Sequence, residues 1–182
     1  MMAFDTGPGN VMIDHVMRVK YQKPYDKDGE IARTGKVDAK IMEQLKGHDY
    51  FKRPVPRSAW RLDFGSSYAD RLIEQYKTVS APDLLATVTE FAAYSIVRSI
   101  TDNVKSLDEI STIMASGGGT RNGYLMERLA THMPKGLRLT KSDEFGVPAA
   151  FKEAIKFAVL AHATVNGLAN NIPAACGATR FA

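Results

Sequence analysis

Residues 109–122 read Glu-Ile-Ser-Thr-Ile-Met-Ala-Ser-Gly-Gly-Gly-Thr-Arg-Asn, and this stretch decides the fold class. Its first seven residues are rich in isoleucine and threonine, which favour a β-strand. The strand leads directly into three glycines, and apolar periodicity predicts a helix over residues 124–133. A strand that passes through a glycine-rich turn into a helix is typical of α/β proteins, so we assign the chain to that class.

Helices dominate the rest of the expected structure. Ser80 is expected to cap a long helix that has Pro82 and Asp83 in its first turn. A second short strand is expected over residues 136–139, and the proline-containing stretch 51–64 is expected to be a loop. The other helices are expected over residues 11–20, 38–45, 68–76 and 148–166.

The composition is that of an ordinary globular domain. Of the 182 residues, 45% are hydrophobic and 24% are charged, which excludes a disordered tail, a collagen-like fibre and a low-complexity linker. No apolar run approaches the ~20 residues of a membrane span, and no secretory leader is visible, so we expect no membrane partner. The single Cys176 cannot form an internal disulfide, which fits the reducing cytoplasm.

The positive charge is concentrated in the first third of the chain. The net charge is +4, and residues 1–61 hold 12 lysines and arginines against 8 aspartates and glutamates. Residues 62–182 hold 12 of each kind. A surplus this small suits a phosphate-bearing ligand and does not require nucleic acid, which we do not expect as a partner.

Residues 4–10 read Phe-Asp-Thr-Gly-Pro-Gly-Asn and admit several interpretations. Aspartic proteases also carry Asp-Thr-Gly, but they need two such loops, and the chain has no second copy. In a phosphate loop, Gly7 and Gly9 would let the backbone approach an anion, and Asn10 would cap a helix whose free N–H groups lie beside it. Asp5 would then act as a general base or orient a metal-bound water. An ordinary Gly-Pro-Gly turn before a helix is the remaining interpretation.

A second glycine motif, Gly117-Gly118-Gly119, lies between the expected strand and helix. Three consecutive glycines carry a high cost in conformational entropy, which makes sense where a flat or charged ligand lies against the backbone. The motif lacks the Lys-Ser/Thr of a Walker loop and the spacing of a dinucleotide fingerprint. A tight strand–helix turn is the alternative.

Glu153 lies on the apolar side of the helix expected over residues 148–166. At ~100° per residue, it falls between Phe157 and Leu160. A carboxylate on an apolar arc is costly unless it is paired, bound to a ligand or at the edge of a cleft. A boundary glutamate that reaches solvent is also compatible with the pattern. His162 falls within the same arc and is expected to be a buried histidine.

Three motifs in this order resemble those of the anhydro-N-acetylmuramic acid kinase family, which includes the levoglucosan kinases. They are residues 4–10, residues 117–122 (Gly-Gly-Gly-Thr-Arg-Asn) and residues 146–154 (Gly-Val-Pro-Ala-Ala-Phe-Lys-Glu-Ala). Residues 25–29 (Tyr-Asp-Lys-Asp-Gly) and the terminal Ile-Pro with Gly-Ala, within residues 172–178, also look like that family. The resemblance therefore covers nearly the whole chain.

The resemblance implies a helix-rich α/β fold of the actin/hexokinase type, which is ribonuclease H-like. Such kinases have two lobes with ATP and Mg²⁺ in the cleft between them. They open the 1,6-anhydro bridge of a sugar and phosphorylate its 6-oxygen in one reaction, as in the catabolism of the amino sugar anhydro-N-acetylmuramic acid. On this resemblance, residues 1–182 are the carboxyl-terminal lobe.

The resemblance also implies roles for individual residues. Asp5 would be the base that activates the attacking water. Glu153 would line the site near the metal or the sugar, and the metal ligands themselves stay unassigned. The residues that would approach ATP are Thr6, Gly7, Gly9, Asn10, Gly117, Gly118, Gly119 and Asn122.

The chain departs from the family pattern in two respects. The family carries Lys-Ser/Thr-Thr-Gly-Arg-Glu where residues 57–62 read Arg-Ser-Ala-Trp-Arg-Leu, so Trp60 replaces a glycine and Leu62 a glutamate. This puts sugar positioning and lobe closure in question and leaves the sugar open. The family's amino-terminal lobe, with its Gly-Thr-Ser-x-Asp-Gly phosphate loop, is absent from these 182 residues.

Two functional hypotheses follow from these departures. Either the chain is one lobe of an anhydrosugar kinase, with little or no activity when isolated, or it is a degenerate nucleotide-binding lobe without catalysis. The expected partners are ATP, a small anhydrosugar and the missing lobe. The oligomeric state is left open, with a homodimer among the options.

Overall fold

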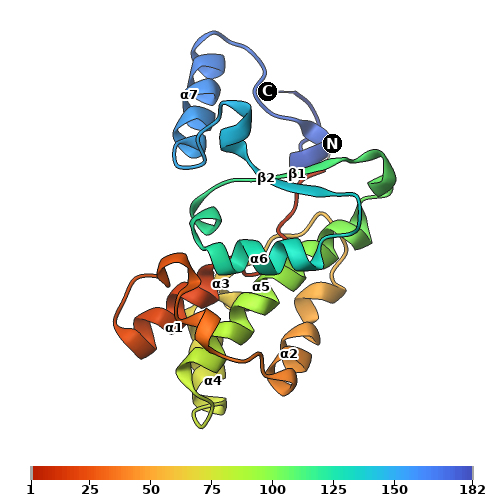
Figure 1. The fold of residues 1–182 in the computed structure, drawn as a ribbon. Helices are drawn as coiled ribbons and strands as arrows, with labels where there is room; N and C mark the ends of the chain where they lie inside the picture. The colour runs from red at the N-terminus through yellow and green to blue at the C-terminus, as the bar shows by residue number, and fades with distance from the viewer. Residues whose placement is uncertain (1, 182) are drawn as a thin grey trace.

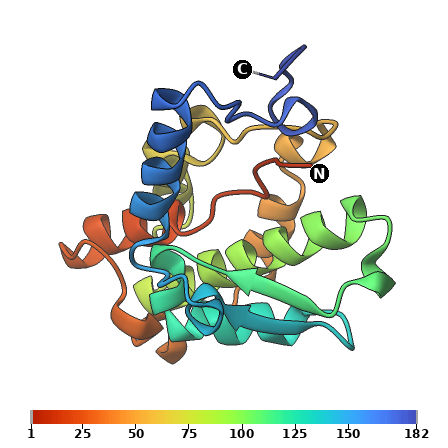
Figure 2. The same cartoon turned by 90° about the horizontal axis from the view of Figure 1, so that it is seen from above.

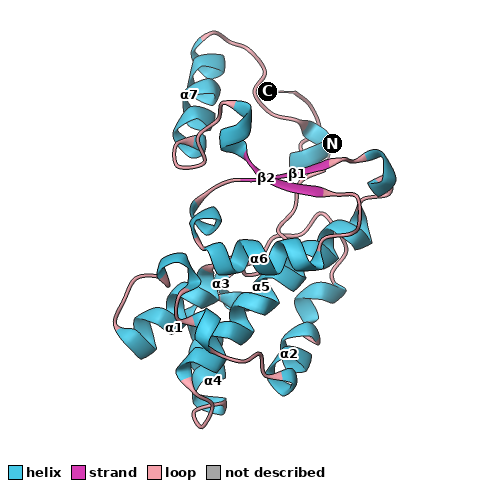
Figure 3. Ribbon diagram, in the orientation of Figure 1, coloured by secondary structure: helices cyan, strands magenta, loops and turns pink. Residues whose placement is uncertain are grey.

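Helices make up most of the computed structural model, which describes residues 2–181 (Figure 3). The α-helices are α1 Val11–Tyr21, α2 Ala39–Lys46, α3 Arg61–Phe64, α4 Ser66–Gln75, α5 Ala81–Asn103, α6 Gly123–His132, α7 Lys152–Val165 and α8 Pro173–Cys176. The strands are β1 Thr112–Ala115 and β2 Arg138–Lys141. The helix-rich α/β class expected from the sequence is therefore confirmed, whereas the actin/hexokinase type stays a prediction.

The long helix α5 is the centre of the fold, with α1, α2 and α6 packed on it (Figures 1 and 2). Its predicted cap is confirmed, because the hydroxyl of Ser80 accepts a hydrogen bond from the backbone N–H of Asp83 at 3.2 Å. Every residue from Leu84 to Ala93 is buried. Neither α5 nor any other helix of residues 2–181 combines the length and apolar character needed to cross a bilayer.

The strands β1 and β2 pair in parallel, with Thr112 opposite Arg138 and Ala115 opposite Lys141. They are joined through α6, so the three elements form one β–α–β unit. Neither strand has a second neighbour among the described residues. Helices α5 and α6 lie on one side of the strands, whereas α7 and the carboxyl-terminal segment lie on the other side (Figure 1).

A buried carboxylate fastens α6 to α5. Glu90 of α5 accepts hydrogen bonds from Arg128 Nε and Nη2 at 2.5 and 3.1 Å, and His132 Nε2 lies 2.6 Å from its Oε1. Burial alone would raise the pKa of Glu90, but the hydrogen bonds from Arg128 and His132 outweigh burial and lower it. Because α6 begins directly after the second glycine motif, this contact fixes that motif relative to α5.

The two strands differ in their bounds from the sequence-based expectation. The strand expected over residues 109–115 begins at Thr112, because Leu107–Glu109 form a single 3-10 turn. The strand expected over residues 136–139 runs from Arg138 to Lys141. Residues 134–137 form a turn instead, in which Gly136 has a φ of +91°.

Two further expectations are wrong at helix or loop boundaries. The last long helix begins at Lys152 and not at residue 148, because a turn that ends with the bond from Phe151 N to Pro148 O precedes it. The expected loop 51–64 ends in the short helix α3. Asp63 starts this helix by accepting a hydrogen bond from Trp60 N at 2.9 Å.

We predict that Glu90→Gln lowers the free energy of unfolding by about 2 kcal/mol near neutral pH, because Arg128 and His132 lose their charged partner. The pKa of Glu90 is lowered in the folded state, so the contribution is present above the usual value of 4.5 and is lost as the pH falls through the folded-state pKa. Urea unfolding of both proteins at a series of pH values measures this difference, which should shrink in acid.

Glu127→Gln is the matched control for this substitution. Glu127 pairs with Arg33 at the surface, and its side chain is 58% exposed. Exposed ion pairs contribute little to stability, so this variant should unfold at nearly the same urea concentration as the wild type. Equal effects of the two substitutions would contradict the proposed fastening of α6 to α5.

Candidate functional site

The loop of residues 4–10 lies directly against α5. The φ angle of Gly7 is +151°, and a Cβ at this position would lie 2.7 Å from Ser95 Oγ. Only glycine permits both this backbone angle and this close approach. One turn further along α5, the hydroxyl of Ser99 donates a hydrogen bond to Thr6 O at 3.1 Å. The first glycine of the motif is therefore required by packing, whatever ligand the loop binds.

Asp5 is held at three of its atoms. Its N–H donates to Arg57 O at 2.9 Å, and its Oδ2 accepts from the N–H of Ala59 at 2.7 Å. The hydroxyl of Tyr50 donates to its carbonyl oxygen. Asp5 is exposed, and no described residue donates to its second carboxylate oxygen, Oδ1. One carboxylate oxygen is thus fixed while the other stays available to accept a proton.

Arg57 supports the residues that hold Asp5. Its guanidinium lies 4.7 Å from the ring centroid of Tyr50, and it donates to the carbonyl oxygens of Phe51 and Arg53 at 3.2 and 2.9 Å. It also donates to the hydroxyl of Ser99 at 3.4 Å. Arg57 therefore joins both segments that hold Asp5 to α5.

An ion pair between the buried Asp63 and the exposed Arg53 fixes the loop around Trp60. Asp63 receives hydrogen bonds from Arg53 at 2.5 and 3.0 Å, and these bonds are the main reason why its pKa is lowered. Asp63 also accepts from Trp60 N, next to the Ala59 N–H that binds Asp5. Trp60 itself is 72% exposed and lines a cavity of about 270 Å³ together with Asp5 and Gly7.

The amino end of α1 lacks the predicted side-chain cap. Asn10 precedes α1, but its amide donates to Asp14 Oδ2 at 2.6 Å and makes no capping hydrogen bond. The expectation of an Asn10 cap is wrong because Asp14, one turn along, competes for that side chain. The first N–H groups of the helix are left without a side-chain partner, which suits an anion. Burial raises the pKa of Asp14.

The second glycine motif presents an open backbone. A Cβ built at Gly117 or Gly118 would have no atom within 4 Å, so crowding does not explain glycine at these positions. At Gly117 the φ angle of +91° favours glycine in any case. Asn122 caps α6, since its Oδ1 accepts from Leu125 N at 2.9 Å. No described residue accepts a hydrogen bond from its amide nitrogen, which stays free to donate to a ligand.

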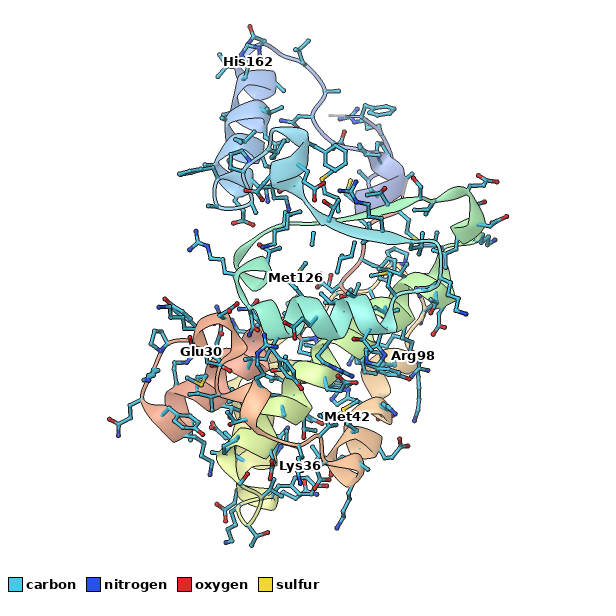
Figure 4. The ribbon with its side chains drawn as sticks, in the orientation of Figure 1. Glu30, Lys36, Met42, Arg98, Met126 and His162 are labelled. Carbon is cyan, nitrogen blue, oxygen red and sulfur yellow. The ribbon has the colours of Figure 1, made fainter. Side chains whose placement is uncertain are left out.

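The two glycine motifs come together around two adjoining cavities. The first cavity, about 500 Å³, is lined by both motifs and by apolar side chains of α5, α6 and the strands, among them Met126, which is labelled on α6 in Figure 4. The second, about 670 Å³, is lined by Asn10, Asp14, Tyr25–Asp28, Glu30, Gly118, Gly119, Arg121 and Asn122. Seven of the eight predicted ATP-contacting residues line one or both of these cavities, namely Thr6, Gly9, Asn10, Gly117, Gly118, Gly119 and Asn122.

Glu153 does not join this site. It lies on α7, where its side chain is 75% exposed and 3.8 Å from Lys156 Nζ, and it lines none of the three cavities. His162 was expected to be buried, and this expectation is wrong, because His162 is exposed near the far end of α7 (Figure 4). The apolar arc that suggested burial is mostly exposed, and only Leu160 and Ala163 of α7 are half-buried.

Several structural contacts of the site could not be read from the sequence. Tyr50 and Arg57 act through backbone atoms of distant residues, and no spacing in the sequence points to them. Asp28 accepts a hydrogen bond from Gly123 N at 2.9 Å, which ties the 25–29 segment to the start of α6. Among residues 2–181, no group of three or more His, Cys, Asp and Glu side chains is arranged to hold a metal ion.

The amino-acid sequence of the chain is similar to those of known proteins. The family model described as anhydro-N-acetylmuramic acid kinase matches residues 1–182. Proteins named anhydro-N-acetylmuramic acid kinase from Caldanaerobacter subterraneus, Francisella tularensis and Gloeobacter violaceus are each 38% identical to the chain, and the matches cover 98%, 97% and 99% of it. They cover 46%, 46% and 47% of the relatives. The chain thus spans about half the length of the curated relatives it matches.

We predict that Tyr50→Phe destabilises the loop that carries Asp5. Removing the hydroxyl leaves the ring under Arg57 in place but deletes the hydrogen bond to Asp5 O. The free energy of unfolding should fall by about 1 kcal/mol, and the backbone amide resonances of residues 4–7 should shift in heteronuclear NMR spectra.

Tyr76→Phe is the control, because it also deletes one hydrogen bond, from Tyr76 to Gln44 Oε1 at 2.6 Å, but away from the site. It should cost a similar amount of stability and leave the resonances of residues 4–7 in place. Unchanged Asp5 and Thr6 resonances in Tyr50→Phe would show that Tyr50 does not hold the loop.

Proposed function

The chain belongs to the anhydro-N-acetylmuramic acid kinase family, and we propose that it forms one lobe of a two-lobed, ATP-dependent anhydrosugar kinase. The observation that supports this best is the meeting of the two glycine motifs around two adjoining cavities. The motifs are far apart in sequence, and a shared ligand explains why both present open backbone there. In the complete kinase this chain would be the carboxyl-terminal lobe.

The residues that line the two cavities suit different parts of ATP. The larger cavity carries the carboxylates of Asp14 and Asp28, which suit the hydroxyl groups of a ribose. The exposed ring of Tyr25 and the backbone at Gly118 offer flat surfaces for the base. The triphosphate would then lie along residues 6–10 and the uncapped amino end of α1.

Asp5 is the candidate base of the reaction. Its free Oδ1 would take a proton from water as the water oxygen attacks the anomeric carbon of the sugar. The bond from that carbon to the bridging oxygen breaks, and the released 6-oxygen then attacks the terminal phosphorus of ATP. The bond from that phosphorus to the β-phosphate oxygen breaks, and ADP leaves. The backbone contacts from Arg57 and Ala59 hold the carboxylate in place for this proton transfer.

Magnesium would serve this reaction by neutralising the phosphate charges when bound with ATP. The residues described here form no metal site of their own. Magnesium ions that accompany nucleotides are held largely by phosphate oxygens and water, so we assign the metal to ATP. The role predicted for Glu153 requires α7 to become part of the site, which it is not in this structure.

A nucleotide-binding lobe without catalysis is the second candidate. Asp5 is exposed, so in this chain alone nothing excludes bulk water from the proposed base. This favours ATP binding without turnover by the isolated chain. Substitution of Gly118 tests nucleotide binding, and substitution of Asp5 tests catalysis.

We predict that Gly118→Val blocks ATP binding to the 182-residue chain. A side chain at Gly118 meets no atom within 4 Å, so folding should be little affected, but the new methyl groups would occupy both cavities. The dissociation constant for ATP, followed by amide chemical shifts of residues 116–122, should rise at least ~10-fold, which corresponds to about 1.4 kcal/mol. Gly47→Val, at the carboxyl end of α2, is the control and should bind ATP like the wild type. Equal ATP binding by both variants would place the nucleotide elsewhere.

We predict that Asp5→Asn abolishes turnover without abolishing ATP binding. The assay needs an assembled kinase, in which this chain is joined to the part of a relative that lies outside its match. Loss of a general base should lower kcat at least ~100-fold. Asp102→Asn, at an exposed pair with Arg98, is the control and should stay near wild type. Turnover of Asp5→Asn within about tenfold of wild type would refute the role of Asp5, and an inactive assembly with Asp5 intact would favour the non-catalytic lobe.

A further inference from the structure

Helix α7 is exposed along its whole length. None of its residues is buried, although the sequence Lys-Glu-Ala-Ile-Lys-Phe-Ala-Val-Leu-Ala-His-Ala-Thr-Val is mostly apolar. Phe157 is 59% exposed and Val165 is 85% exposed. The large apolar side chains exposed on α7 and its flanks are Phe145, Phe151, Ile155, Phe157, Val159, Val165, Leu168, Ile172 and Phe181. An exposed concentration of large apolar side chains of this kind points to an interaction site.

The apolar character of α7 is not confined to one stripe. Its charged residues, Lys152, Glu153 and Lys156, all lie in the first two turns, and residues 157–165 contain none apart from His162. A helix that is apolar on all sides is one that is buried in the complete molecule. A 14-residue helix with no buried residue is also marginal in water, so its partner is part of what stabilises it.

The nearby β1–β2 sheet is also incompletely covered. It consists of two parallel strands without further neighbours among the described residues, and Met114 of β1 is 49% exposed. Parallel sheets are normally covered on both faces. Here α5 and α6 cover one side, while α7 stands off on the other side and to one edge (Figures 1 and 2). The two exposed features therefore lie in the same part of the molecule.

We propose that α7 and the uncovered side of the β1–β2 sheet form the docking surface for the other half of the kinase, the part that the relatives carry outside their match to this chain. This inference rests on the two-lobed assembly proposed above. The relatives contain about as many residues again as they share with this chain, enough for a second lobe. The partner surface should be apolar, because residues 157–165 offer it no charge.

A second copy of this chain explains the exposed α7 and sheet less well than the other half of the kinase does. A two-fold contact between two α7 helices would cover one face of each helix and leave the remaining apolar faces in water. It would also leave the strands without further neighbours. A partner that contacts α7 from several sides and approaches the sheet as well accounts for both features.

The test is co-expression of the 182-residue chain with the unmatched part of the Caldanaerobacter subterraneus relative, followed by purification and measurement of stoichiometry by light scattering. We expect a 1:1 complex. The double variant Phe157→Glu/Val165→Glu should weaken association at least ~100-fold, because it places charge in an apolar contact. Both residues are exposed in the isolated chain, so circular dichroism and the thermal transition of that chain should stay close to wild type.

Val19→Glu is the matched control, since Val19 is an exposed apolar residue on α1, away from α7. It should leave the complex intact. Three results would overturn the proposal: a wild-type homodimer that the double variant dissociates, a complex that the double variant leaves unchanged, or no complex at all. A 1:1 complex that fails to phosphorylate any anhydrosugar would uphold the docking surface and refute the proposed kinase activity, so the two inferences fail separately.

Discussion

Burial of α5 is the constraint on which the rest of the structure depends. The helix is covered over residues 84–93, and the groups that meet it there and one turn beyond are those that build the site. At Ser95 the backbone of Gly7 approaches too closely for any Cβ, and at Ser99 a hydroxyl holds Thr6. Glu90 anchors α6 and thereby the second glycine motif. The two motifs keep their relative position because contacts with the same buried helix, α5, hold both of them.

The parts of the fold that the sequence predicted are those with strong local signals. Ser80 caps its helix as expected, because no neighbouring group competes for the oxygen that accepts the backbone N–H group. Asn10 fails as a cap because Asp14 attracts its amide. The second strand is displaced because Gly136 adopts a positive φ and extends the preceding turn. Local patterns locate elements well, but competition between neighbouring groups sets their ends.

The sequence likewise predicted only some residues of the candidate site. The residues that could be predicted line the two cavities, and glycine-rich motifs indicate such exposed backbone in any sequence. Tyr50, Arg57 and Ser99 could not be predicted, because each acts on a backbone atom more than 40 residues away in sequence or on a partner brought close only by folding. The expectation of a buried His162 is wrong for a different reason, and the role of Glu153 stays a prediction. Helical periodicity identifies an apolar face correctly but says nothing about whether its partner is in the same 182 residues.

The internal contacts that hold Asp5 and the exposed surface of α7 have different consequences for how an active kinase would assemble. Asp5 is positioned by Arg57 O, Ala59 N and the Tyr50 hydroxyl, all within this chain, so its orientation exists before any second lobe docks. Docking would therefore not have to order the base, and its effect on Asp5 would be to exclude water. Helix α7 is in the opposite state, since it is mostly apolar and none of its residues is buried in this chain. The free energy of docking would then come mainly from α7 and the sheet, while the site it closes is already in place.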